Sequence, residues 1–282
     1  MMWRVTRKSC VTAGVWALAA ILFPLHTFAS DYLPKKPVPV GRVYLIGIYK
    51  SSFPDFDGLE VSERQLFVPG VGTAVKMSMK GDVIVDVNDY GAFGVYKPPF
   101  YSGDYLNFVG GVGYSVGHVR LELERFGSEF AVKGGTGSVN QDDASNIALV
   151  RGGVITSGNY VVVENKKVGI SSLAFNVCYE RGHTDVVLTY ACVGVSGNRL
   201  NLLNTSSVTH GYQGKIGLGV SVTKNTALLA GAYYHMLHRN SFDPIVLTVP
   251  RRFYDMPKPA AAEANMRVAH LGGELGIRYM FR

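Results

Sequence analysis

The chain has 282 residues, a formal net charge of +7 and three cysteines. The basic excess is mild and its doublets (35–36, 166–167 and 251–252) are far apart, so the clustered basic face that nucleic acid requires is not expected. The high content of glycine, tyrosine and phenylalanine favours strands and turns over helices.

Residues 1–29 have the pattern of a secretory signal peptide. Three basic residues among the first eight precede an apolar stretch at 11–25, and small residues follow where a peptidase would cut. The alternative is an uncleaved N-terminal anchor. Cleavage would leave two cysteines and a net charge of about +4. No later run of about 18 apolar residues exists, so an exported chain is either soluble or a barrel.

After a proline-rich periplasmic lead-in at 30–40, short segments alternate between apolar and polar residues. Alternation with period two is typical of strands with one wet and one dry face. The expected strands are 42–50, 105–116, 119–132, 168–180, 185–195, 212–222, 226–237 and 267–281.

The links between these strands are alternately long and short. Short turns are expected at 117–118, 181–184 and 224–225, and external loops at about 51–104, 133–167, 196–207 and 239–266. This rhythm is typical of outer-membrane barrels, which have short periplasmic turns and long external loops. We therefore predict an all-β fold, a transmembrane antiparallel β-barrel of about eight strands over residues 41–282. Within the first loop, 73–79 and 82–87 are expected to form a small hairpin.

The alternation does not by itself say which face points inward. A soluble barrel would place the apolar face inside, whereas a membrane barrel places it against lipid. Aromatic residues near the strand ends favour the membrane barrel. We therefore expect charged residues to point into the lumen, where opposite charges pair because an unpaired buried charge is costly. These residues are Arg120, Glu122, Glu124, Lys215, Glu274 and Arg278.

Two cysteines, Cys178 and Cys192, lie in the strands of one predicted hairpin. A turn centred near His183 would place Cys178 opposite Leu188, and a turn centred on Asp185 would pair the two cysteines. An oxidising periplasm permits the disulfide. The spacing is not that of a catalytic dithiol.

The histidine and serine residues do not form a recognisable catalytic or metal-binding pattern. His235 and His238 are three apart, so in a strand they face opposite sides and are poor co-ligands for a metal. Ser115 and His118 lie at a presumed periplasmic turn and have no third group to orient them. No catalytic residue, metal site or cofactor is therefore predicted, and we expect the chain not to be an enzyme.

Several segments, in order along the chain, resemble the conserved core of the Anaplasmataceae surface antigens, the group that includes major surface protein 2. The matching segments are FVGGVGYSVGHVRLELERFGSEFAV (108–132), NVCYE (176–180), YACVGVSGN (190–198), YQGKIGLGVSV (212–222), LLAGAYYHML (228–237) and LGGELGIRYMF (271–281). The resemblance implies an outer-membrane barrel exposed on an obligate intracellular, tick-borne bacterium. Some members of the family look like porins, and several are immunodominant antigens.

Together these observations lead us to expect a surface antigen that displays loops to host or vector, with adhesion as a further role. A porin-like passive channel for small solutes is the alternative. The expected partners are outer-membrane lipid, the barrel assembly machinery, host or tick surface molecules, and antibodies. The assembly signal expected at the C-terminus comprises Leu275, Ile277, Tyr279 and Phe281.

Overall fold

The computed structural model describes residues 41–63, 75–79, 86–133, 144–151, 153–184, 186–238, 240–245, 247–248 and 262–281. The expected signal peptide and lead-in lie outside the described residues. Within these ranges, no helix is both long and apolar enough to cross a membrane.

The elements are β1 (Arg42–Glu63), β2 (Val75–Met79), the 3-10 helix η2 (Tyr90–Ala92), β3 (Phe93–Val95), β4 (Phe100–Tyr101), β5 (Asp104–Val116), β6 (Val119–Lys133), β7 (Asn146–Val150), β8 (Tyr160–Glu164), β9 (Lys167–Gly182), β10 (Val187–Leu202), β11 (Thr205–Ser221), β12 (Thr226–Leu237), β13 (Asn240–Ile245) and β14 (Ala262–Met280).

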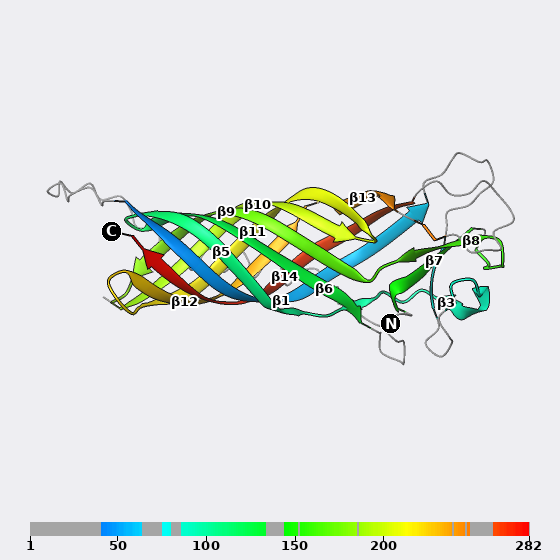
Figure 1. Cartoon of the computed structure of the whole chain (residues 1–282), viewed down its shortest axis with the longest axis horizontal. Helices are drawn as coiled ribbons and strands as arrows, with labels where there is room; N and C mark the ends of the chain where they lie inside the picture. The colour runs from blue at the N-terminus through cyan, green and yellow to red at the C-terminus, as the bar shows by residue number, and fades with distance from the viewer. Residues whose placement is uncertain are drawn as a thin grey trace, which may run out of the picture. The chain divides into compact units, whose positions relative to one another are not determined.

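Eight of these strands form a closed antiparallel ring in the order β1, β5, β6, β9, β10, β11, β12 and β14. The ring closes where β14 pairs with β1, from Tyr44 opposite Met280 to Glu63 opposite Ala262. Figure 1 shows the long strands running obliquely side by side. The prediction of an eight-stranded antiparallel barrel is confirmed.

The side chains show which face of the barrel points inward. On β6, Leu121 and Leu123 are each 41% exposed, whereas Glu122 and Glu124 are 1% and 0% exposed. The same division holds around the ring, so the outer surface is apolar and the charged groups are inside. A soluble barrel would show the reverse, because its apolar side chains would form the core. This arrangement is that of a membrane barrel.

Exposed aromatic side chains mark the two edges of this apolar band. Tyr114, Tyr179 and Tyr279 lie near the strand ends that carry the short turns. Toward the other end, Tyr49 packs edge-on against Phe108 with ring centroids 5.7 Å apart. Amphipathic rings at both edges are what the two membrane–water interfaces select.

The barrel strands extend farther from the short-turn rim than the sequence predicts, and this shortens three of the expected external loops. β1 continues through residues 51–63, which alternate around a bulge at Gly58 (φ +66°). The expected loop at 196–207 is almost entirely strand, because β10 and β11 are joined by Leu203 and Asn204 alone. Both residues have positive φ, at 52° and 58°, which is the backbone of a tight type I′ hairpin turn. The last strand likewise begins at 262 instead of 267.

A second, smaller sheet is built from the two longest external connections, in the order β3, β2, β7 and β8. We call this sheet, together with η2, the external cap. The expected partner of β2 was the segment 82–87, most of which lies outside the described residues. In the structure β2 pairs with β3 and with β7 instead. The sequence predicted β7 and β8 as part of a polar loop, but every residue of β7 is buried.

The external cap and the barrel share one hydrophobic core. Ile147, Leu149, Val161 and Val163 of the cap cluster with inward residues from the far ends of the barrel strands, and Phe130 is among the latter. The opposite face of the cap sheet is covered by a separate cluster that includes Phe93 and Tyr160. Because both faces of β7 and β8 are buried, the described strands of the two connections form packed structure above the membrane.

Candidate functional site: the barrel lumen

The centre of the lumen holds a set of paired charges around Lys215. Its ammonium nitrogen lies 2.7 Å from Glu122 Oε1 and 2.5 Å from Glu124 Oε1, and all three residues are no more than 3% exposed. Asn176 and Gln213 donate to Glu124 Oε2 at 3.2 and 3.3 Å. Each buried carboxylate is therefore both paired and hydrogen-bonded, as a desolvated charge requires.

Lys50 on β1 links this group of charges to Glu274 on β14. Its ammonium nitrogen lies 3.6 Å from Glu124 Oε2 and 3.8 Å from Glu274 Oε2, and it sits 4.7 Å from the ring centroids of both Phe126 and Tyr233. Cation–π contacts of this kind gain strength where water is excluded. Lys50 is 1% exposed.

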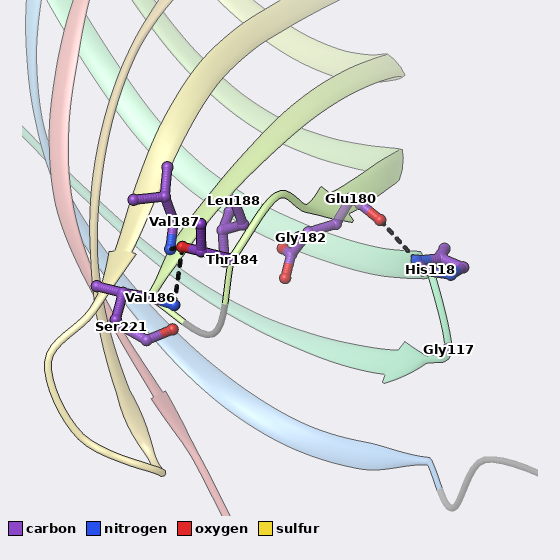
Figure 2. Close-up of a pocket in the computed structure, with 9 residues that line it drawn as sticks. All are labelled: Gly117, His118, Glu180, Gly182, Thr184, Val186, Val187, Leu188 and Ser221. Atoms are coloured by element: carbon purple, nitrogen blue, oxygen red, sulfur yellow. Dashed lines mark hydrogen bonds between the residues drawn. The ribbon is translucent and has the colours of Figure 1, made fainter.

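The short-turn end of the lumen is closed by a third ion-pair group. Glu180 accepts from Arg278 Nη1 at 2.6 Å and Nη2 at 3.1 Å, and also pairs with Arg120. Glu180 lines a pocket of about 200 Å³ at this rim, together with His118 and Leu188 (Figure 2). Glu180 is the most exposed of these ion-paired residues, with a side chain 18% exposed.

We call these eight residues the lumen ion network: Lys50, Arg120, Glu122, Glu124, Glu180, Lys215, Glu274 and Arg278. The structure brings together all six charged residues that the sequence singled out. It adds Lys50 and Glu180, and so balances four positive charges with four negative ones. Both additions share the inward parity of their strands, which is the signal that could have found them.

Two tyrosines fill space beside inward-facing glycines. Tyr44 donates to Glu122 Oε2 at 2.9 Å, and Tyr190 donates to Glu274 Oε1 at 2.8 Å. A Cβ atom at Gly113 would lie 2.1 Å from Tyr44, and one at Gly217 would lie 2.5 Å from Tyr190. The glycines therefore make room for phenol rings that complete the ion network.

Above the lumen ion network lies a neutral layer that we call the histidine layer: Ser52, Ser196, Tyr233, His235 and His270. His235 Nδ1 lies 2.9 Å from His270 Nε2, and His235 Nε2 lies 2.8 Å from Ser196 Oγ. Tyr233 Oη lies 3.4 Å from His270 Nδ1 and 2.5 Å from Ser52 Oγ. The contact between His235 and His270 was not predicted from the sequence. His270 is four residues from the inward Glu274, and that shared parity was the available signal.

The other residues considered for chemistry lie apart from one another. His238 is on the outer surface and stacks on His210 with centroids 4.8 Å apart, whereas His235 points into the lumen. His118 Nδ1 lies 3.0 Å from the carbonyl oxygen of Glu180. In the described part of the chain, no group of three or more histidine, cysteine or acidic residues could hold a metal ion.

Cys178 and Cys192 are opposite each other in the register of β9 and β10 and form a disulfide. This register is the one that follows from a turn centred on residue 185. The expected assembly signal lies at the C-terminus, and its four side chains point away from the barrel interior with exposures of 44–61%: Leu275, Ile277, Tyr279 and Phe281.

The geometry supports closure of the lumen more than it supports chemistry. From the short-turn rim outward, the lumen contains the ion network, then the histidine layer, then the core shared with the external cap. Ser196, His235 and His270 are 6%, 0% and 0% exposed, so the described residues around them cover them almost completely. The paired charges occupy the barrel interior at the level of the ion network.

An eight-stranded antiparallel ring with a lipid-facing apolar surface and a charged interior defines an integral outer-membrane β-barrel protein. The solved structure of OprG from Pseudomonas aeruginosa has the same fold, with a TM-score of 0.51, 12% identity, and coverage of 87% of this chain and 98% of that one. The neisserial surface protein NspA matches with a TM-score of 0.40 and 11% identity over 86% of this chain and 97% of that one.

The surface antigen family model matches residues 36–281. Major surface antigen 4 of Anaplasma marginale is 30% identical over 277 residues, which cover 96% of this chain and 94% of that protein. The chain therefore belongs to the Anaplasmataceae surface antigen family, as the resemblance of its strand segments implied. It is an outer-membrane surface antigen.

Proposed function

We propose that the protein is a closed display scaffold: the barrel anchors a folded external cap that meets host or vector molecules, and conducts no solute. The observation that supports this most directly is the filling of the lumen at successive levels. Lys215 and Glu124 are nearly inaccessible in its centre, and Phe130 and Leu149 are 0% exposed where the barrel meets the cap. An eight-stranded barrel has an interior that side chains can fill completely.

The mechanism would be display on a rigid support. Loops on a stable scaffold carry binding functions because they tolerate sequence change. Among the described residues of the cap, this tolerance belongs to outward positions, because β7 and β8 are buried on both faces. Exposed apolar side chains such as Val95 (87%) and Val154 (73%) are available for contact with antibodies or with host or tick surface molecules.

We also propose that the chain is not an enzyme. The one described serine–histidine chain, Ser196 with His235 and His270, lies inside a filled lumen. A nucleophile must meet its substrate, so a buried arrangement of this kind supports a structural role. For biogenesis, we propose that the outward aromatic residues Tyr279 and Phe281 present the C-terminal strand to the barrel assembly machinery.

The first test is liposome swelling with the refolded mature chain, using sugars and amino acids of graded size. We expect no swelling from protein whose folding is shown by its heat-sensitive gel mobility. Arg120→Ala and Glu274→Ala are expected to lower stability without producing flux. Swelling with a sharp size cutoff would contradict closure and support the porin-like channel instead.

The second test concerns the external cap. The folded barrel in lipid nanodiscs should bind host or tick cell surfaces, and Val95→Asp with Val154→Asp should reduce that binding. Val208→Asp is the matched control, because this valine is 82% exposed on the barrel strand β11 and not on the cap. Equal loss in the control would show that the cap is not the contact surface.

A further inference from the structure

The disulfide between Cys178 and Cys192 lies on the inner face of the barrel wall. The two cysteines are 1% and 3% exposed and belong to the same buried cluster as Tyr44, Leu188 and Tyr190. Neither is among the residues that line the pocket at the short-turn rim in Figure 2. The sulfur atoms are therefore shielded within the closed barrel.

The neighbouring strands cover the disulfide with charged side chains. In the strand register Arg120 of β6 lies beside Cys178, and Lys215 of β11 lies beside Cys192. Arg120 Nη2 is 4.0 Å from Cys192 Sγ. These strands are the two that flank the β9–β10 hairpin, so the cover exists only after both have paired with it.

On the periplasmic side, an ion-pair group lies between the disulfide and the short-turn rim. Glu180 is two residues beyond Cys178 on the inward face of β9, and its carboxylate bridges Arg120 and Arg278. Arg278 comes from β14, whose pairing with β1 closes the ring. This ion-pair group is therefore complete only when β14 has joined the barrel. A thiol–disulfide exchange reaction needs direct access of one sulfur to another.

We propose that the Cys178–Cys192 bond is made before the barrel closes, by a periplasmic thiol oxidase acting on the β9–β10 hairpin while its inner face is still open. A thiolate of the chain attacks the disulfide of the oxidase and forms a mixed disulfide. The second cysteine then displaces the oxidase as its reduced dithiol. The two chain thiols lose two protons and two electrons in total, and the electrons reduce the oxidase disulfide.

The test compares oxidation of the reduced chain before and after folding. Mature chain is refolded in detergent with its thiols kept reduced, its folding is verified by heat-sensitive gel mobility, and oxidised glutathione is then added. Alkylation and mass measurement report free thiols. We expect the denatured chain to oxidise and the folded barrel to retain both free thiols for as long as it stays folded.

A matched control moves the cysteine pair along the same two strands to an accessible place. Ser171 and Arg199 are register partners on the outward, exposed face of β9 and β10. The variant Ser171→Cys/Arg199→Cys, made with Cys178→Ser/Cys192→Ser, should oxidise equally before and after folding. If the native pair in the folded barrel oxidises as fast as this control, the proposal is wrong.

A complementary measurement starts from the oxidised barrel, so the test does not depend on the reduced chain folding. Folded protein with the bond intact is treated with a water-soluble phosphine or dithiol reductant. The native bond should resist reduction until denaturant opens the barrel, whereas the control bond should be reduced at once. Reduction of both bonds at the same rate in the folded state would overturn the proposal.

Discussion

The membrane-level part of this barrel and its external part have opposite polarity on the same strands. On β6, Leu121 faces lipid and Glu122 faces the lumen, but farther along the same strand Glu129 is exposed and Phe130 is 0% exposed. β14 changes in the same way, from outward Leu275 to outward Arg267. On these two strands the inward and outward parity does not change along the strand; only the chemistry of each face does.

This inversion follows from what surrounds each part. In lipid, apolar side chains gain nothing by pointing inward, so the interior is left to charges that satisfy one another. Above the membrane the exterior meets water, and the ordinary hydrophobic effect places apolar groups inside. A membrane-spanning strand needs only about 9–11 residues, so the 19 residues of β14 extend into both environments.

Breaking the lumen ion network should have the largest effect. Glu124→Ala leaves Lys215 and Lys50 without one of their carboxylate partners, and removal of one member of a buried ion pair costs about 3–5 kcal/mol. Urea unfolding in lipid vesicles measures the loss. The matched control is Lys167→Ala, which breaks the exposed ion pair with Glu129 and should cost less than about 1 kcal/mol. Equal costs would contradict a buried network.

The external core should be weakened separately from the membrane part. Leu149→Ala removes a buried cap side chain from the shared core, at a cost of about 2–5 kcal/mol. The loss should appear as faster proteolysis of the cap while the barrel keeps its heat-sensitive gel mobility. Loss of the folded barrel itself would show that cap and barrel unfold as one unit.

A charge placed on the outer face should distinguish the two environments directly. Val193→Arg and Asn201→Arg both point outward from β10, at membrane level and above it respectively. Arginine on the lipid face costs about 2–4 kcal/mol near the bilayer midplane, whereas an exposed surface substitution stays within about 0.5 kcal/mol. Similar unfolding midpoints in vesicles for the two variants would contradict the assigned membrane level.

The smallest effect expected is a loss of cap stability at alkaline pH. Burial raises the pKa of Tyr160 in the cap to about 12, and Asp86 and Asp89 add to the shift. Because the folded-state pKa is higher than the unfolded value of about 10, the stabilisation is complete below pH 10 and is lost as the pH rises toward 12.

Cap proteolysis measured from pH 9 to pH 12 tests this expectation. Tyr160→Phe should reduce the pH dependence, and Tyr101, whose buried phenol also has a pKa raised to about 12, should contribute to the remainder. The membrane-level part provides the internal control, because its gel mobility should not change over the lower half of this range. An unchanged pH profile in the variant would rule out Tyr160 as the source.

The fold was predictable because strand alternation is a local property of the chain. The outward run Leu121 and Leu123 against the inward Glu122 and Glu124 is visible in the sequence, and so is the two-residue turn at 117–118. The prediction of a loop at 196–207 was wrong because the tight turn there is Leu203–Asn204, which lacks the glycine that usually marks a tight hairpin. The cap strands were not predicted for a different reason. β7 and β8 are buried on both faces, so their sequences do not alternate between apolar and polar residues.

The sequence by itself determined that this chain forms about eight alternating strands with short turns at one rim, and it identified six of the eight residues of the lumen ion network. The tertiary structure alone decided the register. The register pairs Cys178 with Cys192, sets His235 against His270, and places Glu180 between two arginines. Each of these contacts depends on turn geometry, bulges and ring closure, because a period-two pattern excludes a slip of one residue but is satisfied equally well by a slip of two.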